Sequence, residues 1–223
     1  MKISQIIFLA FAAVFFSACA ASSPKTDYSA LMQTKPRSIL VLMPTNETAD
    51  VKASAAVAAN AFAPLSELGY YVFPVALVND TFKHNGISEP AEISQVPLNK
   101  LKEIFGADSA LYLNVTRYGS TYKLIDSVTA ASVSAKLVDL SSGVTLWQRS
   151  VTAQKNSSSG SGNLLGALIS AAISQIADTI SEAGYDMAVV ADEVLFAPDC
   201  DECLLRGARS PKYGQDRQIS GSQ

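Results

Sequence analysis

The chain has 223 residues, 48% of them hydrophobic, and a formal net charge of −3 at pH 7. That acidic balance lacks the basic footprint with which proteins bind nucleic acid, so no nucleic-acid partner is expected. The length suits one domain with short appendages, and the apolar content suffices for a core.

Residues 1–18 have the pattern of an export signal. Lys2 precedes the apolar run "IIFLAFAAVFF", and the small residues of "SAC" follow it. The apolar run at 6–16 is shorter than the ~20 residues of a membrane-spanning helix. Removal of the signal takes away only Lys2 among the charged residues, so the mature chain has 16 basic and 20 acidic side chains and a net charge of −4.

Cys19 follows Phe16-Ser17-Ala18, and the stretch resembles the lipobox of bacterial lipoproteins, which usually carries Leu where Phe16 stands. The resemblance implies that the signal is cut before Cys19, that Cys19 is acylated, and that Ala20 directs the protein to the outer membrane. Three acyl chains would anchor it firmly. The alternative is an ordinary secreted protein in which Cys19 is a leftover thiol. Residues 19–36 are expected to be a flexible tether behind the lipidated Cys.

Residues 38–77 are predicted to form a β-α-β unit with two parallel strands. The apolar run "SILVLMP" at 38–44 is typical of a strand buried on both faces. An Ala-rich helix follows and ends at Gly69, with Pro64 kinking or interrupting it. The stretch "YYVFPVAL" at 70–77 is interpreted as the second strand.

In the middle of the chain, the sequence pattern changes from one typical of helices to one typical of antiparallel strands. A polar loop at 78–96 is expected to lead into a short helix from 97 to 106, and "ADSALYLNVTRYG" into a third strand. The alternating stretch that follows, the turn "SSG" at 141–143 and the strand "VTLWQRSVTA" predict a hairpin. Gly143 stands where a positive φ costs least.

The last part of the chain predicts a low-complexity loop at 154–163, a helix at 164–184 and a second helix at 185–197. The element order predicts an α/β (α+β) fold: a mixed sheet built as β-α-β-α-β plus an antiparallel hairpin, with helices packed on the sheet and C-terminal helices. We expect a single domain at 37–197, followed at 198–223 by a Cys-pair segment and a polar tail.

Two stretches carry a resemblance to a known domain: "GADSALYLNVTRYG" at 106–119 and "AKLVDLSSGVTLWQRS" at 135–150. With the element order, they are similar to the domain shared by the N-terminal part of TolB and the curli secretion lipoprotein CsgG. The whole chain, including "RSPKYG" at 209–214, is similar to a family of outer-membrane lipoproteins of unknown function in Gram-negative bacteria. The resemblance implies the fold and a cell-envelope setting, and it supplies no catalytic residues.

Cys200 and Cys203 form the motif "CDEC", for which we considered three chemistries. A zinc site would need two further ligands, and His84, the only histidine, has no sequence link to the pair. The three acidic neighbours would lower the reactivity of a redox pair, because negative charge raises thiol pKa values. A structural disulfide formed in an oxidising periplasm is the favoured interpretation, and no metal or cofactor is expected.

Small residues recur once per turn along the predicted helix 164–184, at Gly162, Gly166, Ser170 and Ser174. Such a strip lets another helix or a sheet approach closely. It either packs on the domain's own sheet or forms an interface with a partner or a second copy, which would make a homo-oligomer. The glycines match neither the dinucleotide fingerprint nor a P-loop.

The leading interpretation is a non-enzymatic lipoprotein, held in the outer membrane by its N-terminal lipid, that acts as an interaction or assembly module for an envelope protein. It could serve as an accessory of a transport or secretion complex. One alternative is a periplasmic lipoprotein that binds a small molecule or glycan near 78–96 and Tyr118 to Tyr122. Another is a hydrolase, which would need polar groups converging on His84.

Overall fold

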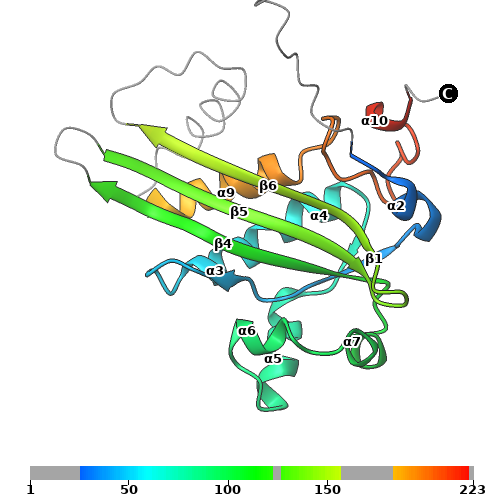
Figure 1. Cartoon of the computed structure of the whole chain (residues 1–223), viewed down its shortest axis with the longest axis horizontal. Coiled ribbons are helices and arrows are strands. Elements are labelled where there is room, and N and C mark those ends of the chain that lie inside the picture. Colours follow the sequence, from blue (N-terminus) through cyan, green and yellow to red (C-terminus); the bar gives the residue numbers. More distant parts are fainter. Residues whose placement is uncertain (1–25, 123–126, 157–182, 221–223) are drawn as a thin grey trace, which may run out of the picture.

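A six-stranded mixed sheet forms the centre of the computed structural model, which describes residues 26–122, 127–156 and 183–220 (Figure 1). The strand order is β3-β1-β4-β5-β6, and β2 pairs with β4. The strands are β1 Ser38–Val41, β2 Thr45–Asn46, β3 Tyr71–Val72, β4 Ser109–Tyr122, β5 Ser127–Asp139 and β6 Thr145–Asn156. β1 runs parallel to β3 and β4, whereas β4, β5 and β6 are antiparallel, so the predicted mixed α/β fold is confirmed.

Helices cover most of one face of this sheet and, at the end where β1 lies, part of the other face. The helices of the described residues are α2 Ser29–Thr34, α3 Ala53–Asn60, α4 Phe62–Glu67, α5 Val75–His84, α6 Pro90–Ile93, α7 Leu98–Phe105, α9 Ala183–Leu195 and α10 Arg217–Ser220. α3, α4 and α9 lie along one face, and α5, α6 and α7 gather at the end where β1 lies (Figure 1). None of these helices is long and apolar enough to cross a membrane.

The strand β1 separates two apolar clusters. Ile39 and Val41 belong to the larger cluster under α3, α4 and α9, and Leu40 and Leu42 belong to the smaller cluster under α5, α6 and α7. These four side chains are at most 1% exposed. The uninterrupted apolar run therefore marks a strand covered on both faces, as the sequence predicted.

The hairpin between β5 and β6 is confirmed as well. Gly143 has a φ of +75°, and its N–H donates to the carbonyl of Asp139 at 2.9 Å. The Asp139 carboxylate accepts from the N–H and the hydroxyl of Ser142, each at 2.7 Å. The side chain of Asp139 thus supplies the acceptor that holds this tight turn.

The Ala-rich helix is interrupted near Pro64, as predicted. α3 ends at Asn60 and α4 begins at Phe62. Because Pro64 has no N–H, it cannot donate to the carbonyl of Asn60 four residues earlier, and the helix breaks at that point.

The predicted strand at 70–77 is wrong beyond its first residues. Only Tyr71 and Val72 pair with β1, and a helix, α5, starts at Val75 directly after Pro74. A short apolar run fits both a strand and a buried helix turn, and periodicity over so few residues cannot separate them. Residues 78–96, predicted as a loop, accordingly contain most of α5 and all of α6.

The predicted tether at 19–36 is also shorter than expected. Residues 29–34 form α2, and Tyr28 and Leu31 belong to the larger apolar cluster at 6% and 4% exposure. Two apolar side chains three residues apart are enough to dock one helical turn on a neighbouring surface. The folded body therefore includes residues well before 37.

The predicted polar tail packs against the domain. Leu204 and Leu205 are buried, and the N–H groups of Gly207 and Arg209 donate to the carbonyls of Leu68 and Gly69 at 2.9 and 3.1 Å. Although the segment is polar in sequence, its Arg206 is paired with Asp199 and Asp216. α9, at 183–195, occupies the stretch predicted as the last helix, whereas nearly all of the helix predicted at 164–184 lies outside the described residues.

We expect Gly69→Ala to test the docking of this C-terminal segment. Gly69 has a φ of +93°, and a Cβ there would lie 2.3 Å from the backbone nitrogen of Ser210. The positive φ alone costs roughly 1–2 kcal/mol, and the clash should bring the loss of unfolding free energy to about 3 kcal/mol or more. Urea unfolding followed by Trp147 fluorescence measures it.

Gly86→Ala is the matched control for this substitution. Gly86 has a similar φ of +79°, with nothing within 4 Å of an added Cβ. It should therefore show only the backbone cost of about 1 kcal/mol. Equal losses in the two variants would contradict the packing of 207–210 on Gly69.

Candidate functional site

The Cys200–Cys203 pair closes a short loop directly after α9. The two sulfur atoms lie 2.00 Å apart, at disulfide bonding distance, and the N–H of Cys203 donates to the carbonyl of Cys200 at 3.1 Å. Cys203 is fully buried, whereas Asp201 and Glu202 are exposed. Among the described residues, no group of three or more His, Cys, Asp and Glu side chains is placed to hold a metal ion.

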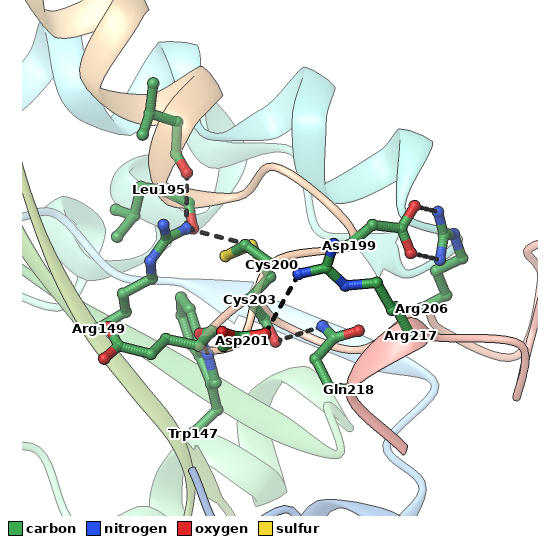
Figure 2. Close-up of a disulfide and its surroundings, with 12 residues drawn as sticks. Trp147, Arg149, Leu195, Asp199, Cys200, Asp201, Cys203, Arg206, Arg217 and Gln218 are labelled. Carbon is green, nitrogen blue, oxygen red and sulfur yellow. Dashed lines mark hydrogen bonds and ion pairs between the residues drawn. A yellow bond between two sulfur atoms is a disulfide. The ribbon is translucent and has the colours of Figure 1, made fainter. Parts of the chain in front are cut away.

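Hydrogen bonds from three distant parts of the chain converge on this loop. The hydroxyl of Tyr28 donates to the carbonyl of Cys203 at 2.7 Å, and the indole N–H of Trp147 donates to that of Glu202 at 2.8 Å. The amide of Gln218 donates to the Cys203 carbonyl at 3.2 Å (Figure 2). The loop therefore fastens the N-terminal segment, β6 and α10 to one another.

Arg149 from β6 caps the end of α9 beside the disulfide. Its guanidinium donates to the carbonyls of Val194 and Leu195 at 2.7 and 3.0 Å and to the Cys203 sulfur at 3.4 Å (Figure 2). Burial lowers the pKa of Arg149, although a guanidinium stays charged at any physiological pH. Since the last turn of α9 has no basic residue of its own, Arg149 supplies the cation that a helix C-terminus favours.

Arg206 joins the loop to the C-terminal segment through two carboxylates. It donates to both oxygens of Asp199, at 2.8 and 2.5 Å, and to Asp216 at 3.0 Å. The Asp216 side chain is 1% exposed, and its Oδ1 also accepts from the backbone N–H of Arg206 at 3.1 Å. The bond from Arg206 lowers the pKa of Asp199. This cluster, in which Arg206 and Asp216 are buried and Asp199 is exposed, is the physical reason why residues 206–216 are not a free tail.

Asp192 is a buried carboxylic acid that the sequence reasoning missed. It lies on α9 at 1% exposure, and neither of its oxygens has a hydrogen-bond partner among the described residues. Burial raises the pKa of Asp192 well above its ordinary value of 3.8. In the sequence, this burial is indicated by the position of Asp192 four residues after Ala188, which places it on the apolar face of the helix.

The second face of the sheet carries a broad open hollow of about 1420 Å³. Alternate residues of three neighbouring strands line it with polar side chains: Tyr112 and Asn114, Ser134 and Lys136, and Gln148 and Ser150. The ammonium group of Lys136 lies 5.5 Å from the centre of the Tyr112 ring. Thr26, Asp27 and Ala30 of the N-terminal segment form one border of the hollow.

The other residues singled out in the sequence do not join these sites. Cys19 and the strip of Gly162, Gly166, Ser170 and Ser174 lie outside the described residues. His84 stands at the exposed end of α5, where its Nδ1 contacts the backbone carbonyl of Asp80 at 2.9 Å. Of the segment 78–96, Ser94 alone borders either of the two hollows described here, and Tyr118 packs against the larger apolar cluster.

Comparisons with known proteins place the chain in context. The family model described as "GNA1162-like: Putative lipoprotein GNA1162-like" matches residues 26–209. The protein "Putative lipoprotein NMB1124/NMB1162" of Neisseria meningitidis serogroup B (strain ATCC BAA-335 / MC58) is 43% identical over 205 residues, which are 91% of this chain and 95% of that protein. The crystal structure of lipoprotein GNA1162 from Neisseria meningitidis has 47% sequence identity and a TM-score of 0.55, and covers 65% of this chain and all of that one.

We predict that Arg149→Met destabilises the protein by about 2–4 kcal/mol. Methionine keeps much of the aliphatic packing but leaves the carbonyls of Val194 and Leu195 without their donor. Guanidinium unfolding with the disulfide intact measures the loss. Arg117→Met, which removes an exposed arginine from β4, should cost less than about 0.5 kcal/mol. A comparable effect of both substitutions would contradict the capping role.

We also predict that Asp192→Asn stabilises the protein at pH 8 and not at pH 4. A carboxyl whose pKa is raised on folding binds its proton more tightly in the folded chain, so wild-type stability falls as pH rises from about 3.8 toward the folded pKa. Above that range, Asn should raise the melting temperature by roughly 5 °C. Glu193→Gln, on the exposed side of α9, should leave the dependence of the melting temperature on pH unchanged. If the melting temperatures of Asp192→Asn and wild type change in parallel as pH rises, the idea is refuted.

Proposed function

The chain belongs to the GNA1162-like family of lipoproteins, and from that premise we propose that it is a non-enzymatic lipoprotein of the outer membrane that serves as an interaction or assembly module in the cell envelope. An accessory role in a transport or secretion complex fits this proposal. The signal pattern before Cys19 and the sorting residue Ala20 support the outer membrane as its location.

The observation that carries the proposal is the position of the open sheet face beside the anchored end of the chain. Thr26 and Asp27 border the hollow, and the Tyr28 hydroxyl fastens this segment to the disulfide loop. Thr26 lies seven positions after Cys19, a span of at most about 25 Å when the chain is fully extended. A lipid on Cys19 would therefore hold the hollow close to the membrane surface.

The hollow suits a macromolecular partner better than a small ligand. Its volume of about 1420 Å³ exceeds the ~300–1,000 Å³ that is usual for ligand pockets, and it is open to solvent along the strands. Asn114, Ser134 and Gln148 offer hydrogen-bond donors and acceptors, and Lys136 offers one positive charge. Such a polar surface favours reversible contact with a protein or a peptide.

The features of the described residues support binding more than catalysis. His84 is exposed on α5, where its ring contacts Asp80, so a hydrolytic centre around it finds no support among the described residues. Asp192 has the perturbed pKa that is common in active sites, but it is buried between α9 and the rest of the core, where a substrate cannot reach it. These features favour binding over catalysis.

The anchor is tested by separating inner and outer membranes from cells that express three forms of the full chain. Wild type should appear in the outer-membrane fraction, and Cys19→Ala should appear as a soluble, folded protein. Ala20→Asp should remain in the inner membrane, because lipidation is intact while the sorting residue is changed. Membrane association of Cys19→Ala equal to that of wild type would refute the lipid anchor.

The interaction surface is tested by a photo-cross-linking amino acid at Gln148, inside the hollow. In intact cells it should give a discrete protein adduct that disappears in the Cys19→Ala background, because the domain is then no longer held at the membrane. Val51, which is 88% exposed and lies outside the hollow, is the control position. Equal adducts at the two positions, or none at Gln148, would contradict this surface.

A further inference from the structure

A second hollow, of about 350 Å³, lies between α2 and the C-terminal segment. It is separate from the open sheet face, since no residue borders both hollows. Its volume falls within the ~300–1,000 Å³ that is usual for pockets that hold small molecules. The two ends of the described chain form most of its wall, so it exists only because both ends pack on the domain.

Apolar side chains form most of the wall of this pocket, both at its base and at its mouth. Leu31, Tyr70 and Leu205 are about 5% exposed or less and form the base, whereas Met32 and Tyr213 are each 44% exposed at the mouth. The Tyr70 hydroxyl donates to the carbonyl of Leu205 at 2.7 Å, so its polar end is already used and its ring faces the pocket. The pocket therefore offers a ligand contacts with carbon atoms over most of its depth.

Two of the charged groups that border the pocket, Arg206 and Asp216, are paired with each other. Arg206 lies between the carboxylates of Asp199 and Asp216, which together outweigh its single positive charge. An anionic group that entered as far as Asp216 would meet a carboxylate to which Arg206 is already bonded. The part of a ligand that reaches the base must therefore be uncharged.

A lysine stands at the mouth of the pocket. Lys35 follows α2 directly, is exposed and borders the pocket, and it forms no ion pair with any carboxylate of the described residues. An apolar channel with a lysine at its entrance is complementary to a molecule with an apolar chain and an anionic head.

We propose that this pocket binds a single acyl chain whose anionic head lies at Lys35, as in a fatty acid or an anionic phospholipid. This inference rests on the proposed function only for the source of the ligand, which is the membrane. α2 begins ten residues after Cys19, a span of at most about 35 Å, so an anchored protein would keep the pocket within reach of membrane lipids.

Binding is tested with the exported Cys19→Ala chain, purified without detergent, and the fluorescent fatty acid cis-parinarate. The probe should bind with saturation, and octanoate, decanoate and laurate should displace it with affinity that rises about threefold to fourfold per added CH₂ until the pocket is full. Absence of saturable binding overturns the proposal, as does affinity that does not depend on chain length.

Substitutions in the pocket show whether the probe binds there. Met32→Asp places a carboxylate in the apolar wall at an exposed helix position and should weaken binding at least about tenfold. Gln33→Asp, one residue further on α2 and outside the pocket, should leave binding unchanged within twofold. If Met32→Asp melts at a lower temperature than Gln33→Asp, the equally exposed Tyr213→Asp on the opposite wall takes its place. Unchanged binding in a folded wall variant overturns the proposal.

The head group and its source are separated by two further measurements. Lys35→Gln should weaken laurate binding roughly twofold to fivefold and leave binding of neutral dodecanol unchanged. Displacement of the probe by laurate alone assigns the pocket to a free fatty acid, and displacement by dioctanoylphosphatidylglycerol as well assigns it to an anionic phospholipid. Displacement by neither, or equal weakening of laurate and dodecanol by Lys35→Gln, overturns the proposal.

Discussion

The backbone carbonyls of the disulfide loop at 200–203 are the constraint on which the packing of both chain ends depends. A buried carbonyl without a donor costs about 1–3 kcal/mol, so the Cys203 carbonyl must find one. Its donors are Tyr28 and Gln218, and Trp147 serves the neighbouring carbonyl of Glu202. Satisfying one short loop therefore draws the N-terminal segment, β6 and α10 to the same place.

Two arginines near this loop also hold separate segments of the chain together. Arg149 ties β6 to the end of α9, and Arg206 ties the loop to the residues that precede α10. Buried or partly buried arginines of this kind contribute mainly when every partner is present, since removal of one leaves the others unpaired in a medium of low dielectric constant. The acidic residues near the cysteines, which argued against a reactive thiol, are in part the partners of these arginines.

Because both ends close on the domain, α2 borders two surfaces of different chemistry. Ala30 faces the polar hollow over the sheet, and Leu31 and Met32 face the apolar pocket beside α10. The hollow offers hydrogen-bonding groups and one lysine. The pocket offers mostly apolar side chains and has a lysine only at its mouth. A partner protein and an acyl chain would thus be recognised on opposite sides of one helix, close to the lipid anchor that we propose.

The sequence alone determined the features whose cause is local. The doubly buried run at Ile39 to Leu42 marked a central strand, Gly143 marked the hairpin turn, and Pro64 marked the helix break. The short run at 70–77 was ambiguous, because apolar residues serve a strand and a helix turn equally well. Only the tertiary structure decided the packing of the chain ends and hence both hollows: the bond from Tyr28 to Cys203 joins groups 175 residues apart, and a contact over that distance leaves no periodic pattern in the sequence.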